Sequence, residues 1–197
     1  MNSWPVCALL ALALGSSGCA RANRDGAAPL ARERFVSTPS SMAYVSTERD
    51  ILGLTGSLRF GGPLGRSALY LKFPSQWRAR GIPEQAFLTL SARESSAITD
   101  ATVTLEAWRI SADWQAHTLQ HWSDKPSLAP PYARTRISAS PAQNLRIDIT
   151  ELVRFAAQNP ERDFGVAVIA SASEGPGVTF SSGFAGGSAP RLELYFR

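Results

Sequence analysis

The sequence has few cysteines and histidines and no long hydrophobic run. Its two cysteines, Cys7 and Cys19, both precede Ala20 in a chain of 197 residues. The rest of the chain therefore contains neither a disulfide between its own residues nor a cysteine-based zinc site. The apolar run at residues 6–14 is too short to cross a bilayer as a helix.

Charge is also sparse, and it is one-sided. Charged residues make up 18% of the chain, the net charge is +4, and only Lys72 and Lys125 of the 20 basic residues are lysines. Arginine suits paired hydrogen bonds to carboxylates, sulfates and phosphates. The arginines are scattered, and the chain has no basic stripe, DNA-reading helix or aromatic ribonucleoprotein motif. Nucleic acid is therefore not expected as a partner.

The first 18 residues are typical of an export signal. The apolar run is followed by small residues, and the "GSSGC" ending resembles a bacterial lipoprotein signal. This resemblance implies lipidation of Cys19 and a membrane anchor. The alternative is an ordinary signal cleaved after Ala20 or Ala22. We expect an exported lipoprotein of the outer membrane, periplasm or cell surface, with a secreted soluble protein as the alternative.

Residues 19–42 are small, polar and charged without periodicity. This composition predicts a flexible tether between the anchor and a folded domain. An alternative interpretation is that Phe35 and Val36 already begin the first strand.

Residues 43–197 predict one all-β domain. Segments such as "SALYLKFP" and "NLRIDIT" alternate between apolar and other residues, and "FGVAVIAS" is continuously apolar, as in a central strand. Many short strands between turn signals predict a single antiparallel β-sandwich of the jelly-roll or Greek-key type. One short helical turn is expected in "DITELVRFAAQNP", capped by Thr150 and ended by Asn159.

The order of motifs resembles a known family. The chain runs "RSALYLKF", "GIPEQAFLTLSA", "ATVTLEAWRI", "HWSDKP", "LRIDITELVRFAAQNP" and "APRLELYF". This series is similar to the DNRLRE-type, disaggregatase-related carbohydrate-binding β-sandwich modules, some of which bind alginate. The resemblance implies that the loop from Trp114 to Pro126 braces the sandwich with buried indoles. The chain has Gln115 and Gly183 near positions where the family commonly has acidic residues, so a family cation site is not expected.

The stretch "SADWQAHTLQHWSDKP" holds both histidines, His117 and His121. Their spacing suits zinc only on a helix, and this segment predicts a loop or strand ends. We therefore expect surface histidines, with metal binding and ligand contact as alternatives. Trp114 and Trp122 are expected to pack in the loop or core. Neither a metal nor a cofactor is expected.

No catalytic motif is present. The chain has no Gly-x-Ser-x-Gly elbow and no phosphate-binding glycine loop. Tyr70, His117 and Arg109 are residue types that a polysaccharide lyase uses, but no spacing supports such a triad. A non-catalytic role is expected.

The expected function is polysaccharide binding, with an acidic glycan such as alginate favoured. Aromatic rings stack on sugars and arginines pair with uronate carboxylates. The candidate contacts are strand residues predicted to face away from the core or to lie on the mixed strand beside them: Tyr70, Lys72, Arg93, Trp108 and Arg109.

The alternative is a structural envelope or extracellular-matrix lipoprotein with a protein partner. An aromatic and arginine groove favours a glycan, and a broad apolar patch favours a protein partner.

Overall fold

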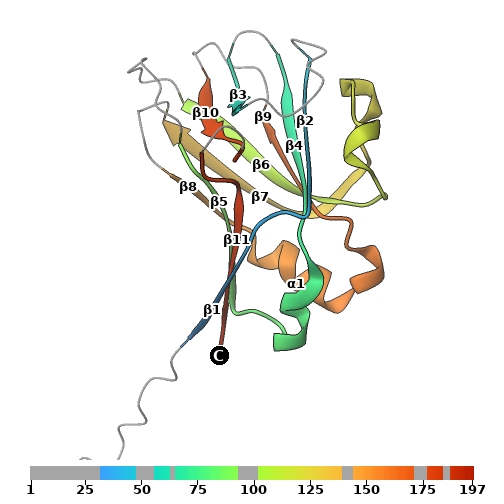
Figure 1. Cartoon of the computed structure of the whole chain (residues 1–197), viewed down its shortest axis with the longest axis vertical. Coiled ribbons are helices and arrows are strands. Elements are labelled where there is room, and N and C mark those ends of the chain that lie inside the picture. The colour runs from blue at the N-terminus through green and yellow to red at the C-terminus, as the bar shows by residue number, and fades with distance from the viewer. Residues whose placement is uncertain are drawn as a thin grey trace, which may run out of the picture. The chain divides into compact units, whose positions relative to one another are not determined.

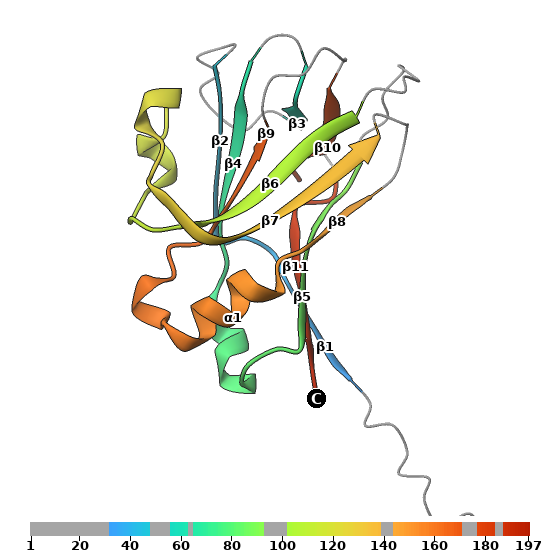
Figure 2. The same cartoon turned by 180° about the vertical axis from the view of Figure 1, so that it is seen from behind.

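Two large antiparallel sheets face each other in the computed structural model (Figures 1 and 2). The model describes residues 32–47, 56–62, 65–92, 102–138, 144–170, 177–183 and 187–197. The four-stranded sheet has the order β1 (Glu33–Ser37), β11 (Arg191–Phe196), β5 (Gln85–Leu90) and β8 (Leu145–Asp148). The five-stranded sheet has the order β2 (Ser41–Ser46), β4 (Ser67–Lys72), β9 (Val166–Ala170), β6 (Thr102–Ile110) and β7 (Leu128–Ser138). A separate pair consists of β3 (Ser57–Phe60) and β10 (Val178–Ser181).

The core lies between the inner faces of the sheets. Leu88 and Leu90 of β5 are fully buried, as are Leu69 and Leu71 of β4. On β8, Leu145 and Ile147 are buried whereas Arg146 and Asp148 are exposed. The predicted alternation is therefore confirmed in these strands, since one side of each meets the core. Strand β9 is buried on both sides between β4 and β6, as its continuous apolar run predicted.

The predicted sandwich and its one short helix are confirmed. Helix α1 (Thr150–Gln158) buries Leu152, Val153 and Ala156, and the N–H of Asn159 closes its end by donating to Phe155 O. Short 3₁₀ helices occur at η1 (Ser75–Arg80), η2 (Ala116–Thr118), η3 (Trp122–Asp124) and η4 (Pro160–Arg162).

The prediction that Thr150 caps α1 is wrong. Ile149 occupies the N-cap position, without a side-chain cap. The Thr150 hydroxyl instead accepts a hydrogen bond from the Ala86 N–H of β5, at 3.0 Å. It also donates to Asp148 Oδ1 at 2.6 Å. Thr150 therefore attaches the start of the helix to the four-stranded sheet.

The sheets begin earlier in the chain than residue 43. Strand β1 pairs along its whole length with β11, from Glu33 opposite Phe196 to Ser37 opposite Leu192. Phe35 and Val36 lie in this strand, as the alternative interpretation of the tether segment had it. Residues 1–31, which include Cys19, lie outside the described residues.

Candidate functional site

A row of outward-facing residues crosses the five-stranded sheet. In register, Ala43 of β2 lies opposite Tyr70 of β4, which lies opposite Ala167 of β9. Ala167 in turn lies opposite Trp108 of β6, and Trp108 lies opposite Tyr132 of β7. Two of the predicted contact residues, Tyr70 and Trp108, therefore share one face and one row.

One end of this row is covered by residues 111–127, which we call the brace loop. The N–H of Ser111 donates to Ser127 O at 2.8 Å and closes the loop at its base. Trp114 is only 4% exposed, and its indole N–H donates to Phe164 O at 2.8 Å. The Trp114 ring lies 5.9 Å from that of Tyr70, centroid to centroid. The expectation that this tryptophan braces the sandwich is confirmed.

Two predicted contacts belong to this covered end. Tyr70 lies on the side of β4 away from the core between the sheets, as predicted, but the brace loop buries it completely, so it is not an exposed contact. Burial also raises the pKa of the Tyr70 hydroxyl. The Lys72 ammonium donates to Asp113 Oδ1 at 2.8 Å and to Trp114 O at 2.6 Å, and it lies 5.0 Å from the centre of the Trp114 ring. Lys72 therefore holds the brace loop down, and the hydrogen bond from it lowers the pKa of Asp113.

Arg109 is not an open contact. It follows the core residues Leu105 and Ala107 on the inner side of β6, the strand whose faces the sequence left unassigned. Arg109 is 7% exposed, donates from Nε to Pro130 O at 3.0 Å, and lies 4.3 Å from the centre of the Phe155 ring. Helix α1 and the start of β7 therefore cover it. Burial lowers the pKa of Arg109. Arg93 lies outside the described residues.

The other end of the row is open, and we call it the β6–β7 strip. Trp108 and Tyr132 stack with their ring centroids 4.2 Å apart and their planes 13° from parallel. Tyr132 is 47% exposed on the edge strand β7. The remaining members follow the same face along the two strands: Glu106, Arg134 and Arg136.

Glu106 fixes the polar part of the strip. Its Oε2 accepts from the Trp108 indole N–H at 3.0 Å, and its Oε1 accepts from Arg134 Nε at 2.8 Å. Burial of this carboxyl raises its pKa, but the hydrogen bonds from Trp108 and Arg134 together outweigh burial, so the pKa is lower than usual. Arg136 is exposed and makes no ion pair within the described part of the chain. The strip thus carries two guanidinium groups for one carboxylate.

A groove of about 460 Å³ borders the strip at the edge of the sandwich. Tyr132 and Ala133 of β7 form one wall. The other walls come from the start of β5, the end of β8 and the first turns of α1: Glu84, Gln85, Asp148, Thr150, Glu151, Leu152 and Arg154. Arg154 is held in place by Glu84 O at 2.9 Å and by Glu151 Oε1 at 3.0 Å. The groove therefore pairs one aromatic ring with several oxygen acceptors.

The histidines of the brace loop take part in local structure. The side chain of His121 and that of Asp124 form a reciprocal capping box around η3. No group of three or more histidine, cysteine, aspartate or glutamate side chains among the described residues is placed to hold a metal ion. None of the described helices is long and apolar enough to span a membrane.

The sequence-based reasoning missed Glu106 on β6 and the three strip residues on β7: Tyr132, Arg134 and Arg136. The three on β7 alternate with Ala133, Thr135 and Ile137, which is the period of a strand with one polar side. Pro130 and Pro131 are of a residue type that is common in turns, and no strand was predicted over this segment. The alternation after these prolines was the available signal.

A family model covers most of the sandwich. The model of carbohydrate-binding module family 96 matches residues 57–195, a range that includes the brace loop, α1 and the β6–β7 strip. No curated protein matches the chain.

Proposed function

Since the chain belongs to carbohydrate-binding module family 96, we propose that it binds an anionic polysaccharide, such as the uronate polymer alginate, on the β6–β7 strip. Modules of such families typically bind sugar without cleaving it. The proposed role is therefore non-catalytic. The resemblance to DNRLRE-type modules, some of which bind alginate, supports a uronate ligand.

One observation carries the proposal: the open end of the sheet combines an exposed aromatic pair with arginines. Tyr132 exposes nearly half of its surface, and Trp108 holds it in place by stacking. A ring held in this way loses little conformational freedom when a sugar packs against it. The groove beside Tyr132 adds carboxylate and amide oxygens that can accept hydrogen bonds from sugar hydroxyls.

The arginines favour an acidic glycan over a neutral one. Guanidinium groups bind carboxylates through two parallel hydrogen bonds. Arg134 is oriented by Glu106, whereas Arg136 has no ion-pair partner among the described residues. Arg136 is therefore the member of the strip best placed to accept a uronate carboxylate.

The alternative of a protein partner has less support. A protein interface needs a contiguous apolar patch. Among the described residues, the exposed large hydrophobic side chains are Val36, Ile82 and Tyr132, and they lie on three separate segments. The observed surface therefore favours a glycan over a structural envelope or matrix role with a protein partner.

We also propose export and a lipid anchor at Cys19, which the "GSSGC" sequence supports. Expression of the full chain in a diderm bacterium, followed by detergent partitioning, tests this. Wild-type protein is expected in the detergent phase, and Cys19→Ser in the aqueous phase. Equal partitioning of the two proteins would favour the ordinary signal peptide.

The binding experiment is a titration of the purified protein with alginate, pectin and neutral glucans, monitored by tryptophan fluorescence at several salt concentrations. Saturable binding to the uronate polymers, weakened by salt, is expected. Arg136→Ala should weaken it about tenfold, the loss of one charge-assisted contact. The matched control is Arg66→Ala, an exposed arginine before β4. Equal binding of neutral and acidic polymers would contradict the acidic specificity.

A further inference from the structure

We propose that the binding site does not end at β7. In this proposal, which rests on the proposed function, a single anionic polysaccharide chain continues over the β7 edge onto the outer face of the four-stranded sheet. That face presents a second group of aromatic and arginine residues, which we call the β8–β11 face: Phe87, Arg146, Arg191, Tyr195, Arg34 and Glu193.

The edge between the two sheets is a continuous path. Strands β7 and β8 are edge strands of different sheets, and they lie side by side (Figure 2). The groove joins them, because its lining runs from Tyr132 on the outer side of β7 to Asp148 and Gln85 on the outer side of β8 and β5. A chain lying on the strip can therefore follow the groove to the second sheet.

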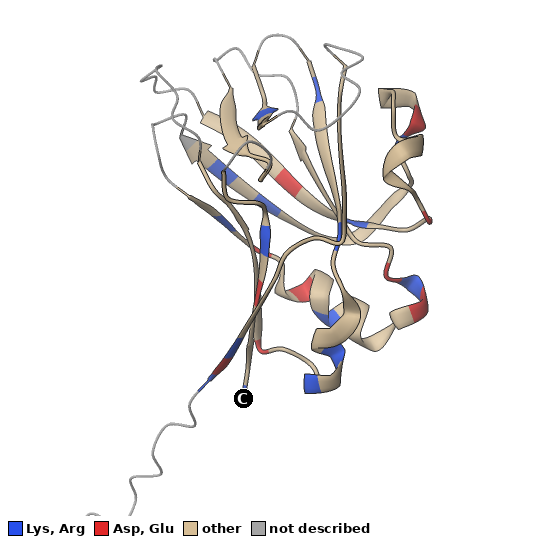
Figure 3. Ribbon diagram, viewed as in Figure 1, with Lys and Arg blue, Asp and Glu red and all other residues tan. Residues whose placement is uncertain are grey.

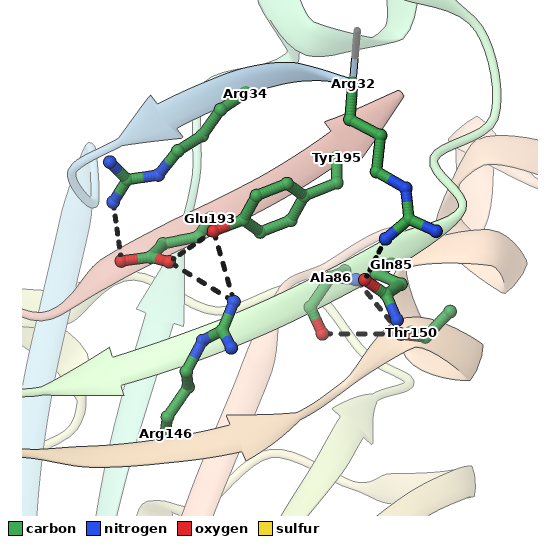
Figure 4. A network of polar contacts seen from close by, with 8 residues as sticks. All are labelled: Arg32, Arg34, Gln85, Ala86, Arg146, Thr150, Glu193 and Tyr195. Carbon is green, nitrogen blue, oxygen red and sulfur yellow. Dashed lines mark hydrogen bonds and ion pairs between the residues drawn. The ribbon is translucent and has the colours of Figure 1, made fainter. Parts of the chain in front are cut away.

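The β8–β11 face is built around a stacked arginine, Arg146. Figure 4 shows its contacts with Tyr195 and Glu193. The Arg146 guanidinium lies 3.4 Å from the centre of the Phe87 ring, and its Nη2 donates to the Tyr195 hydroxyl at 3.2 Å. The Phe87 and Tyr195 rings meet edge to face, 6.1 Å apart. The face thus repeats the composition of the strip, with two aromatic rings beside a positioned guanidinium.

Positive charge exceeds negative charge on this face. Glu193, whose side chain is 12% exposed, is shared by Arg34 at 3.0 Å and Arg146 at 3.6 Å. Arg191 is exposed and makes no ion pair with any described residue. Figure 3 shows basic segments on β7, β8 and β11. Arginines therefore lie on both sides of the edge, and the groove between them has Glu84, Asp148 and Glu151 as well as Arg154 in its lining.

The Thr89 hydroxyl lies between two of these arginines. Thr89 of β5 lies between Arg191 of β11 and Arg146 of β8 in register. Its Oγ1 is buried and has no hydrogen-bond partner within the described ranges. The two arginines thus flank a buried hydroxyl, and a carboxylate-bearing sugar would contact the guanidinium groups and not this atom.

The test is the chain-length dependence of binding, measured by calorimetry with oligouronates from the disaccharide upward. Wild-type affinity should keep rising with length beyond the oligomers that fill the strip. Arg146→Ala with Arg191→Ala should leave the shortest oligomers unaffected and weaken the longest by about tenfold or more. Arg191→Ala alone removes no intramolecular ion pair of the described residues, so this variant is expected to fold, and circular dichroism of the same sample checks that a loss of long-chain affinity does not come from misfolding.

Four results would overturn the proposal that one chain occupies both faces, which we call the single-chain track. The first is a double variant that binds long oligomers as tightly as the wild type does. Arg66→Ala, the control, is expected to bind them with unchanged affinity. The second is a stoichiometry of two long oligomers per wild-type protein that falls to one in the double variant, which indicates two separate sites. The third is no binding of any oligouronate by the wild type, which also removes the proposed function. The fourth is normal binding of short oligomers with an affinity that does not rise with chain length. This result overturns the single-chain track and leaves the proposed function in place.

Discussion

The two ends of the outward-facing row on the five-stranded sheet differ in their exposure to solvent. Tyr70 and Trp108 both point outward and are separated by a single alanine. Tyr70 is completely buried under the brace loop, whereas Trp108 stacks with the exposed Tyr132. The alternation of a strand fixes which side of the sheet a residue occupies. Whether that side meets solvent is decided by a segment from elsewhere in the chain.

Basic residues follow the same division. At the covered end, the Lys72 ammonium donates hydrogen bonds to Asp113 Oδ1 and to Trp114 O. At the open end, Arg134 is held by Glu106, and Arg136 makes no ion pair among the described residues. The covered end therefore stabilises the domain and the open end is available to a ligand.

The largest expected effect is loss of the brace. Trp114→Ala removes a buried indole and its hydrogen bond to Phe164 O, so the free energy of unfolding should fall by about 3–5 kcal/mol. Urea unfolding followed by circular dichroism measures this. Trp122→Ala is the matched control, because that indole is only half-buried and its loss should cost less. Equal losses for the two variants would show that Trp114 has no special bracing role.

Tyr132→Ala should weaken glycan binding and have little effect on the free energy of unfolding. Glycan affinity should fall up to about tenfold, since an aromatic contact contributes roughly 0.5–1.5 kcal/mol beyond its buried area. The free energy of unfolding should change much less than in Trp114→Ala, because Tyr132 is half exposed. Titration with alginate and urea unfolding of the same protein check both parts. A large loss of stability with unchanged affinity would reverse the proposed roles of the two ends.

Acid should weaken the covered end through Asp113. Hydrogen bonds from Lys72 and from the Trp114 backbone lower the pKa of Asp113 in the folded protein. Its contribution to stability is therefore complete above the unfolded value of about 3.9 and is lost as the pH falls through the folded pKa. Asp113→Asn should be less stable than wild type at neutral pH.

The difference between Asp113→Asn and wild type should disappear in acid, because the wild-type carboxyl is then protonated. Urea midpoints measured from neutral pH downward give this difference. Glu161→Gln removes an equal charge from an exposed residue outside the brace loop and serves as the control. A constant difference across the whole range would contradict the proposed ion-pair contribution.

Much of the fold could be predicted from local pattern. Strands β5, β8 and β9 and helix α1 carry periodicities that match their burial. Strand β7 was not predicted; it is an edge strand, and edge strands tolerate prolines such as Pro130 and Pro131. The pairing of strands could not be predicted from their order in the chain, because among the described strands only β6 and β7 are neighbours both in sequence and in a sheet.

The candidate site was less predictable. Of the five expected contacts, Trp108 alone lies on the β6–β7 strip. Tyr70 and Arg109 are buried by segments distant in sequence, and Lys72 is occupied by the brace loop. No periodicity within a strand reports such coverage, because it depends on where a loop docks. Composition could suggest aromatic and arginine contacts, but only the fold shows which of them remain open.

The smallest expected effect is at the covered end, in Tyr70→Phe. The Tyr70 hydroxyl is buried and has no hydrogen-bond partner among the described residues. A buried hydroxyl without a partner loses its hydration in the folded state and gains nothing in return. Its removal should therefore leave stability unchanged or raise it by up to about 1 kcal/mol, while the ring keeps its packing against Trp114.

Urea unfolding measures the change in stability of Tyr70→Phe. Tyr44→Phe is the control, because the Tyr44 hydroxyl donates to Arg59 O and its loss should destabilise the protein. Destabilisation of Tyr70→Phe by a similar amount would mean that a buried water bonds the hydroxyl, and that the covered end contains a polar site as well as an apolar one.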